Sequence, residues 1–190
     1  VGQFSSVRAT LVPSGLRLVL LDPQPLPPAP ESLQKGLDQP KFDPRVSALT
    51  PASRTLLRVH RDAGHYLLII TATNHFITEP IAAELRVDDL IATDPEFKNG
   101  RFTGAVAGTP SFRDGKVTRL QQWLTQQQKN LARSWFYSDS HNDLPLLELV
   151  THPVAVDADD TLTQHAEMKG WPLISLRGVT PLPRIPEFVR

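Results

Sequence analysis

From residue 50 onward, continuous apolar runs alternate with segments whose apolar residues recur at helical spacing. The apolar runs predict strands, since a parallel strand covered on both faces lacks polar positions; they cover residues 66–70, 90–93, 135–137, 153–156 and 171–176. Helical spacing and start signals predict helices that begin at Pro51, near residues 78–80 and at residues 115–116, with further helices over 146–150 and 161–169. Strands that alternate with helices indicate an α/β fold with a mostly parallel sheet.

Two other segments depart from this alternation. The sequence Lys98-Asn99-Gly100-Arg101 predicts a β-hairpin turn that leads into residues 102–106. Prolines between residues 23 and 30 exclude helix and central strand. We therefore expect an atypical proline-rich segment over 1–42 with one strand at 16–22, a core over 43–178 and a tail over 179–190.

Composition limits the class of protein. The 190 residues are 40% hydrophobic and 21% charged, as in soluble globular proteins, and their formal net charge is zero. A neutral chain shows no electrostatic footprint of nucleic acid or of an anionic membrane, so neither is expected as a partner. Residues 1–5 lack the features of a signal peptide, and the absence of cysteine excludes disulfides and thiolate metal sites. These features fit a cytoplasmic protein.

Residues 137–145, Tyr-Ser-Asp-Ser-His-Asn-Asp-Leu-Pro, carry the most informative pattern. Asp139 and Asp143 follow a strand, and the carboxyl edge of an α/β sheet is where ligands bind. Few hard oxygen ligands suit Mg²⁺, which shares its shell with water and phosphate. The other interpretation is an ordinary Asx-rich turn between a strand and a helix. The motif alone favours the two interpretations about equally.

Two further residues fall at the same kind of position. Thr71 follows a strand, where its hydroxyl can face an anion, and Lys116 begins a helix, where its ammonium can reach a phosphate. Taken singly, Thr71 could be only an N-cap and Lys116 a solvated lysine. A hydroxyl, a lysine and two carboxylates that converge on one edge of the sheet indicate phosphoryl transfer.

These residues resemble the haloacid dehalogenase (HAD) superfamily. Residues 69–74, Gly115-Lys116 and residues 137–145 are similar to its later motifs, and residues 154–159 with 170–172 to its closing strand–helix–strand. Within it, the chain is most similar to the phosphoserine-phosphatase-like hydrolases of subfamily IB. The resemblance implies a three-layer α/β/α Rossmann-like core, Mg²⁺ as cofactor and hydrolysis of a small phosphorylated metabolite. Which metabolite, and in which oligomeric state, the residues do not specify.

The resemblance also implies roles for individual residues. Thr71 and Lys116 would hold phosphate, and Asp139 and Asp143 would hold Mg²⁺. The family's nucleophile, which also contacts the metal, corresponds to Asp22. By the same likeness we expect the neighbouring positions to help bind substrate, namely Ala72, Asn74 and Asn142.

The first motif of that family, Asp-x-Asp-x-Thr, is not intact here. Asp22 is followed by Pro23-Gln24, and an amide cannot serve as the acid/base. The interval from Asp22 to Thr71 leaves room for a vestigial cap domain or none. Three accounts fit: a reading frame disrupted before about Asp43, a relative that lost catalysis but kept an anion site, or Asp22 acting with a substitute acid.

We therefore expect impaired phosphatase activity. The alternative is a catalytically inactive HAD-like protein that binds phosphate or a protein partner. Its proline-rich segment, which contains Pro25-Leu26-Pro27-Pro28, could then be a ligand for aromatic-grooved domains.

Overall fold

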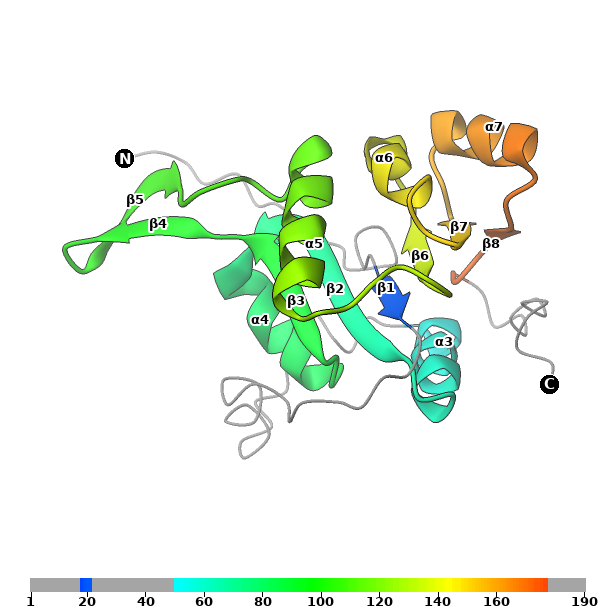
Figure 1. Ribbon diagram of the computed structural model, residues 1–190, viewed down its shortest axis with the longest axis horizontal. Helices are drawn as coiled ribbons and strands as arrows, with labels where there is room; N and C mark the ends of the chain where they lie inside the picture. Colours follow the sequence, from blue (N-terminus) through cyan, green and yellow to red (C-terminus); the bar gives the residue numbers. More distant parts are fainter. Residues whose placement is uncertain (1–17, 22–49, 178–190) are drawn as a thin grey trace.

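The computed structural model describes residues 18–21 and 50–177. Their main feature is a six-stranded sheet in the order β3-β2-β1-β6-β7-β8 (Figure 1). The strands are β1 (Leu18–Leu21), β2 (Tyr66–Asn74), β3 (Asp89–Thr93), β6 (Trp135–Ser138), β7 (His152–Val156) and β8 (Leu173–Ile174). The helices are α3 (Pro51–Asp62), α4 (His75–Glu84), α5 (Asp114–Gln126), α6 (Leu144–Leu147), α7 (Asp160–Lys169) and the 3₁₀ helix η1 (His141–Asp143).

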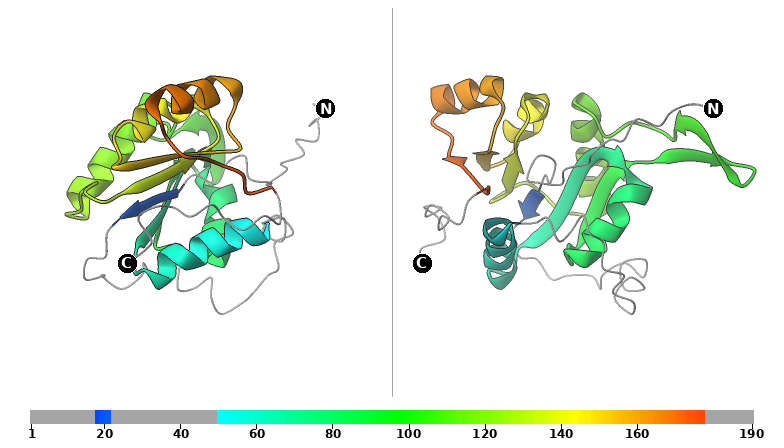
Figure 2. Two further views of the ribbon diagram at one scale, coloured as in Figure 1. Left: turned by 90° about the vertical axis from the view of Figure 1, so that its right-hand side faces the viewer. Right: turned by 180° about the vertical axis from the view of Figure 1, so that it is seen from behind.

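Helices cover both faces of the sheet, which confirms the predicted three-layer α/β/α fold. Along β2, Leu67 and Ile69 belong to a core cluster with residues of α3 and α4, whereas Leu68 and Ile70 belong to a second cluster with residues of α5, α6 and α7. This alternation follows from the period of two in a strand, and a strand buried on both faces must be apolar at every position. Figure 2 shows α3 and α7 on opposite sides of the sheet.

Local sequence signals set several element boundaries. Thr50 caps α3 by accepting a hydrogen bond from the Ser53 backbone N–H at 3.2 Å, and Pro51 follows at the first helical position, as predicted. The next helix was predicted to begin near residues 78–80, but α4 begins at His75. There Asn74 Oδ1 accepts from the Phe76 N–H at 2.8 Å, and Pro80 lies inside the helix.

Two predicted elements near the carboxyl end of the chain differ from the structure. The helix predicted over 146–150 is the shorter α6, which starts two residues earlier directly after η1. The strand predicted over 171–176 is reduced to β8, Leu173–Ile174. Only these two residues pair with β7. The apolar residues around them made the predicted strand longer than the one observed.

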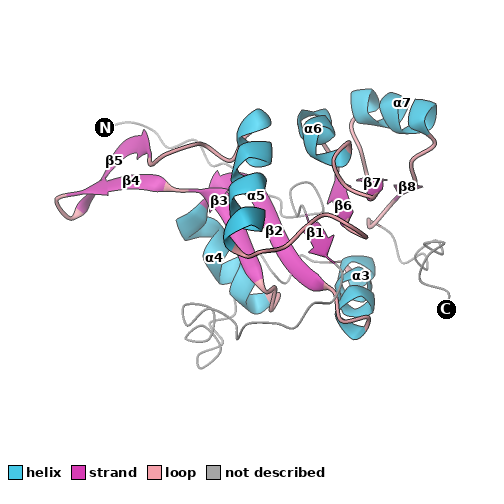
Figure 3. Cartoon of the chain, viewed as in Figure 1, coloured by secondary structure: helices cyan, strands magenta, loops and turns pink. Residues whose placement is uncertain are grey.

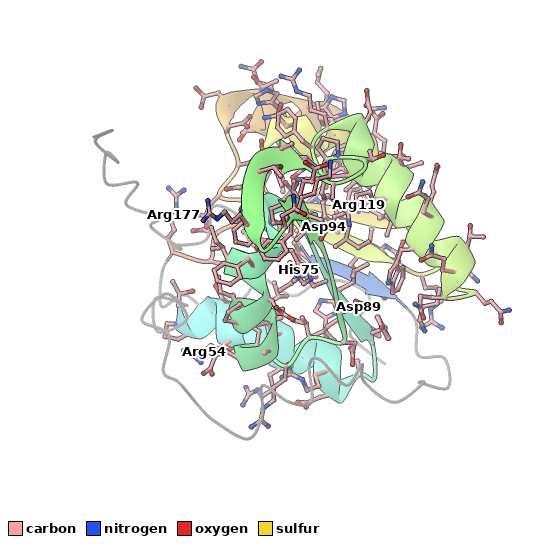
Figure 4. All side chains as sticks on the ribbon, turned by 90° about the vertical axis from the view of Figure 1, so that its left-hand side faces the viewer. Arg54, His75, Asp89, Asp94, Arg119 and Arg177 are labelled. Carbon is pink, nitrogen blue, oxygen red and sulfur yellow. The ribbon has the colours of Figure 1, made fainter. Side chains whose placement is uncertain are left out.

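The predicted hairpin is confirmed as β4 (Pro95–Lys98) and β5 (Arg101–Val106). Asn99 and Gly100 have φ angles of 52° and 76°, as a two-residue turn with both central residues left-handed requires. The hairpin extends away from the main sheet (Figure 1). At its base, Arg119 Nη2 of α5 pairs with Asp94 Oδ2 at 2.7 Å (Figure 4).

Strand β1 has the opposite direction to the other five strands of the main sheet. It pairs antiparallel with both β2 and β6, whereas β2–β3, β6–β7 and β7–β8 are parallel pairs (Figure 3). Leu21, its last residue, pairs with Tyr66 at the start of β2. The carboxyl end of β1 therefore lies at the amino-terminal edge of its neighbours.

Candidate active site at the carboxyl edge of the sheet

Strand register places Thr71 and Asp139 at the same edge of the sheet. Ile69 of β2 and Tyr137 of β6 both pair with Leu18 of β1, one on each side. Because β2 and β6 run in the same direction, Thr71 and Asp139 each lie two residues further toward the carboxyl edge. Two interstrand spacings separate them, about 10 Å. There are two spacings because one strand, β1, lies between β2 and β6.

A buried ion pair lies at this edge. Lys116 in the first turn of α5 places Nζ 2.5 Å from Asp143 Oδ1, and both side chains are almost completely buried. The hydroxyl of Ser138, the last residue of β6, donates to Asp143 Oδ2 at 2.7 Å. Each oxygen of the carboxylate therefore has a donor, as a buried charge requires. The pair fixes the lysine ammonium beside the end of β6.

The start of α5 is held at the edge by its preceding loop. The Ser111 N–H donates to Thr93 Oγ1 at the end of β3 at 3.1 Å. Gly115 is required next to Lys116, because a Cβ there would lie 2.1 Å from the Pro110 carbonyl oxygen. This close approach of two backbone segments directs Lys116 toward the sheet.

The loop between β6 and α6 is a capped turn that also carries the carboxylates. Ser140 Oγ accepts from the Asn142 N–H at 3.3 Å and from Asn142 Nδ2 at 3.1 Å. The Asx-rich turn of the simpler interpretation is thus present. It exists together with the Asp143 ion pair, so the turn is the means by which the carboxylates are positioned.

A second contact ties this loop to the start of α7. Asp159 Oδ2 accepts from the His141 N–H at 2.8 Å and lies 2.9 Å from His141 Nδ1, while Oδ1 caps α7 through the Leu162 N–H. Partial burial raises the pKa of Asp159, but the hydrogen bonds from Leu162 and His141 outweigh it and the pKa lies below its ordinary value. The Asp159 N–H also donates to the Asp139 carbonyl at 2.9 Å. Asp139 is therefore held at the edge through its backbone.

Thr71 was predicted to follow a strand, but it lies within β2, which extends to Asn74. Thr71 is 3% exposed, and its Oγ1 accepts from the Thr73 N–H at 3.1 Å. Within residues 50–177 the Thr71 hydroxyl proton has no acceptor. The helix cap is Asn74, so Thr71 is not the N-cap that the simpler interpretation proposed. The side-chain oxygen of Asn74 accepts the hydrogen bond of that cap. Ala72, between Thr71 and Asn74 in sequence, is half-buried.

The predicted nucleophile, Asp22, lies outside the described residues. Leu21, the residue before it, pairs with Tyr66, at the opposite end of β2 from Thr71. The direction of β1 therefore does not bring its carboxyl end to the edge that holds Thr71, Lys116, Asp139 and Asp143.

The donor set for a metal ion is small. In the described part of the chain no three His, Asp or Glu side chains gather as metal ligands, and both Asp143 oxygens accept from Lys116 and Ser138. Asp139 is half-buried at the edge. One or two carboxylates completed by water and phosphate oxygens suffice for Mg²⁺, so Asp139 fits a magnesium that is shared with a bound phosphate.

Three residues of this site had not been singled out from the sequence. Ser138 and Asp159 support Asp143 and the 139–143 loop, and Arg113 donates from Nε to Asn142 Oδ1 at 3.1 Å. Ser138 could have been found, because it is next to Asp139 in the motif. Arg113 and Asp159 had no local signal, since their partners are 29 and 18 residues away.

Comparisons with known proteins indicate the same family as the sequence motifs. The family model described as haloacid dehalogenase-like hydrolase matches residues 21–148. A histidinol-phosphatase from Neisseria meningitidis serogroup C is 43% identical over 136 residues, which are 70% of this chain and 61% of that protein. The phosphoserine phosphatase SerB1 of Mycobacterium tuberculosis is 34% identical over 125 residues, 66% of this chain and 41% of that protein. The chain thus spans 41% to 61% of the length of these relatives.

Solved structures show a related fold. A protein with unknown function from Bordetella pertussis Tohama I superposes with a TM-score of 0.63 and 36% identity, over 77% of this chain and 80% of that chain. A phosphoserine phosphatase in the form of a phospho-aspartyl intermediate analogue has a TM-score of 0.54 at 17% identity, over 77% and 80% of the two chains, which shows the shared fold alone. No helix in residues 50–177 combines the length and the apolar character that a membrane crossing needs.

Proposed function

This chain belongs to the haloacid dehalogenase-like hydrolase family, and from that premise we propose that its carboxyl edge is a phosphatase site that binds small phosphate monoesters and whose turnover is impaired or lost. The observation that carries the proposal is the buried Lys116–Asp143 pair, 2.5 Å long, at the edge that also holds Thr71 and Asp139. The relatives named histidinol-phosphatase and phosphoserine phosphatase support the same class of substrate.

The proposed chemistry uses each side chain in one role. The Thr71 hydroxyl donates to one phosphate oxygen, and the Lys116 ammonium neutralises a second. Asp143, itself held by Ser138, fixes the position of that ammonium, so little reorganisation is needed when the ester is bound. Asn142, next to Asp143, contributes its amide at the same end of the site. The positions of Ala72 and Asn74 place further backbone N–H groups beside Thr71.

Asp139 is the residue proposed to hold Mg²⁺. Both carboxylate oxygens of Asp143 already accept hydrogen bonds, from Lys116 and Ser138, so we propose that Asp143 affects the metal only indirectly. A bound magnesium ion would offset the negative charge that builds up on the transferring phosphoryl group. Asp139 is suited to that role because its backbone is already tied to Asp159 at 2.9 Å. Its backbone is therefore already fixed at this edge before phosphate binds.

The source of the nucleophile separates two versions of the proposal. In the active version, a carboxylate, Asp22 by the family likeness, attacks phosphorus to form an acyl phosphate as the P–O ester bond breaks and the alcohol leaves with a proton from solvent; water then hydrolyses the acyl phosphate to inorganic phosphate and restores the carboxylate. In the second version the chain binds phosphate monoesters without turning them over. The antiparallel pairing of β1 with both neighbours favours the second version, because its carboxyl end lies at the other edge.

Hydrolysis of p-nitrophenyl phosphate, with and without Mg²⁺, tests the active version, and calorimetric binding of inorganic phosphate tests both. We expect Thr71→Val, Lys116→Met and Asp139→Asn to lose phosphate binding. Lys98→Met on the hairpin and Asp160→Asn on α7 are matched controls at exposed positions and should keep it. Turnover that Asp22→Asn abolishes identifies the active enzyme, and binding without turnover identifies the inactive relative. Absence of both from the unaltered chain would refute the proposal.

A further inference from the structure

We infer that Arg119 is a positioning residue for the proposed phosphate site. It attaches α5 to the carboxyl end of β3, and by doing so it sets the spacing between Lys116 on α5 and Thr71 on β2. The inference rests on the proposed function, because it concerns how that same site is held together.

The guanidinium of Arg119 contacts three parts of the chain around the exit of β3. Nη1 donates to the Ala92 carbonyl at 2.5 Å and to the Thr109 carbonyl at 3.4 Å. Nη2 lies 2.7 Å from Asp94 Oδ2, and only 20% of the arginine side chain is exposed (Figure 4). A planar guanidinium with five donors can hold a strand end, the base of the hairpin and the loop before α5 together.

Helix α5 has a second attachment to β3 and one to the other side of the sheet. One turn after Arg119, Trp123 Nε1 donates to Asp89 Oδ2 at the start of β3, at 2.7 Å. One turn before Arg119, Lys116 pairs with Asp143, which follows β6. The helix is therefore attached to both ends of β3 and to the loop after β6.

These attachments matter because the proposed site is divided between two parts of the sheet. Thr71 lies on β2, next to β3, whereas Asp139 and Asp143 follow β6, next to β7. Within the described sheet a single strand of four residues, β1, joins the two parts. Helix α5 is a second connection. Its apolar residues pack in the second core cluster, but apolar burial is not directional, so the polar contacts decide where the helix begins.

The spacing of the two parts should decide how tightly the site binds phosphate. An anion that contacts both the Thr71 hydroxyl and the Lys116 ammonium needs these groups at a fixed separation before it arrives. Without Arg119, Lys116 stays paired with Asp143 and moves with the β6 part. The separation from Thr71 then varies, and phosphate has to order it on binding.

Calorimetry with inorganic phosphate and Mg²⁺ measures this effect without any turnover. We expect Arg119→Met to weaken binding by about 5- to 50-fold, within the range for two coupled sites. Arg119→Lys should bind with intermediate affinity, because one ammonium replaces part of the fork. Asp94→Asn should lose less than Arg119→Met, since the contact with the Ala92 carbonyl remains.

The matched control is Arg61→Met, at the end of α3. Arg61 also joins two elements through backbone carbonyls, since its Nη2 donates to the Leu85 carbonyl after α4 at 2.8 Å. Its loss should lower the melting temperature but leave the Kd unchanged. Lower stability alone does not alter an apparent Kd while nearly all molecules remain folded. A change in Kd that is confined to the Arg119 and Asp94 variants therefore identifies positioning.

A distance measurement tests the same inference without phosphate. The chain has no cysteine, so Ile77→Cys on α4 and Gln164→Cys on α7 give two unique spin-label positions, both exposed. Helix α4 connects β2 to β3, and α7 connects β7 to β8. Double electron–electron resonance should show one narrow distance distribution in the unaltered chain and in Arg61→Met, and a broader one in Arg119→Met. If Arg119→Met does not fold, Asp94→Asn takes its place in both measurements.

Two outcomes would overturn the inference while the proposed function stands. One is an unchanged distance distribution in Arg119→Met, and the other is an equal loss of phosphate affinity in Arg61→Met. If the unaltered chain does not bind phosphate, the proposed function is refuted. The distance distributions alone then decide whether Arg119 fixes the two parts of the sheet.

Discussion

His60 on α3 is a buried neutral histidine, and its surroundings predict how stability changes with pH. The ring is fully buried; Nδ1 lies 2.8 Å from His65 Nδ1, and Nε2 lies 2.8 Å from the Tyr137 hydroxyl. The Trp135 ring also packs against it in a T-shaped arrangement, with 5.7 Å between the ring centroids. Burial, and secondarily the nearby His65, lowers the pKa of His60 from 6.5 to about 3.

The sign of the effect follows from proton binding. Between about pH 3 and 6.5 the unfolded chain protonates this histidine and the folded chain does not, so stability falls as pH falls through that range. Relative to pH 7.5, the free energy of unfolding should be lower by about 2 kcal/mol at about pH 5, since an unfolded pKa of 6.5 gives a factor of about 30 in proton binding. This figure holds for any folded pKa well below 5.

Urea unfolding followed by tryptophan fluorescence at the two pH values measures the difference. His60→Gln keeps a polar side chain that does not titrate, so its stability should change by about 2 kcal/mol less than that of the unaltered chain between those values. Its absolute stability can drop for packing reasons, and only the pH-dependent part is compared. His75→Gln, at the more exposed start of α4, is the control. An unchanged pH dependence in His60→Gln would show that this reasoning about His60 is wrong.

Three further changes test the site through stability. Lys116→Met should lower the free energy of unfolding by about 3–5 kcal/mol in urea titrations, because it leaves the buried Asp143 without its cation; Lys98→Met, in an exposed pair, should change it by less than about 1 kcal/mol. Ser138→Ala should cost about 1.5–3 kcal/mol, the value of a hydrogen bond to a charged group, and a neutral result would mean that Asp143 relaxes toward another donor. Arg113→Gly should raise the free energy of unfolding by up to about 2 kcal/mol, since relief of about 1–3 kcal/mol of strain at φ 47° exceeds roughly 0.5–1 kcal/mol of added chain entropy; a loss of stability would show that the Arg113 backbone is not strained.

Much of the fold could be predicted because its signals are local. The N-cap at Thr50, the Asn99-Gly100 turn and the apolar run of β2 each depend on neighbours along the chain. Helix α4 was misplaced because Pro80 resembles a helix start, whereas the Asn74 cap, six residues earlier in a polar stretch, gave a weaker signal. Propensity alone does not decide between two competing start signals.

The candidate site was predictable in its residue types but not in its contacts. Its predicted lysine and carboxylates do reach one edge, since that follows from the order of parallel strands. The sequence did not indicate that Asp143 would be committed to Lys116 and Ser138. Nor did it indicate the left-handed backbone of Arg113. Both features depend on loops that are separated in sequence and meet only in the folded chain, and the catalytic roles of these residues stay predictions.

The direction of β1 could not be predicted, and it bears most on function. A run of four apolar residues fits a central strand position in either direction, because an apolar side chain buries equally well whichever way the backbone runs. An apolar strand in either direction can therefore occupy the position between β2 and β6, whether or not its carboxyl end reaches the proposed site. Only the direction of the strand decides which edge its carboxyl end reaches. With β1 antiparallel, that end and the Thr71–Asp139 edge are at opposite sides of the sheet. This favours the accounts in which β1 completes the sheet without supplying the nucleophile, while Thr71, Lys116 and the two carboxylates of the proposed anion site still gather at one edge.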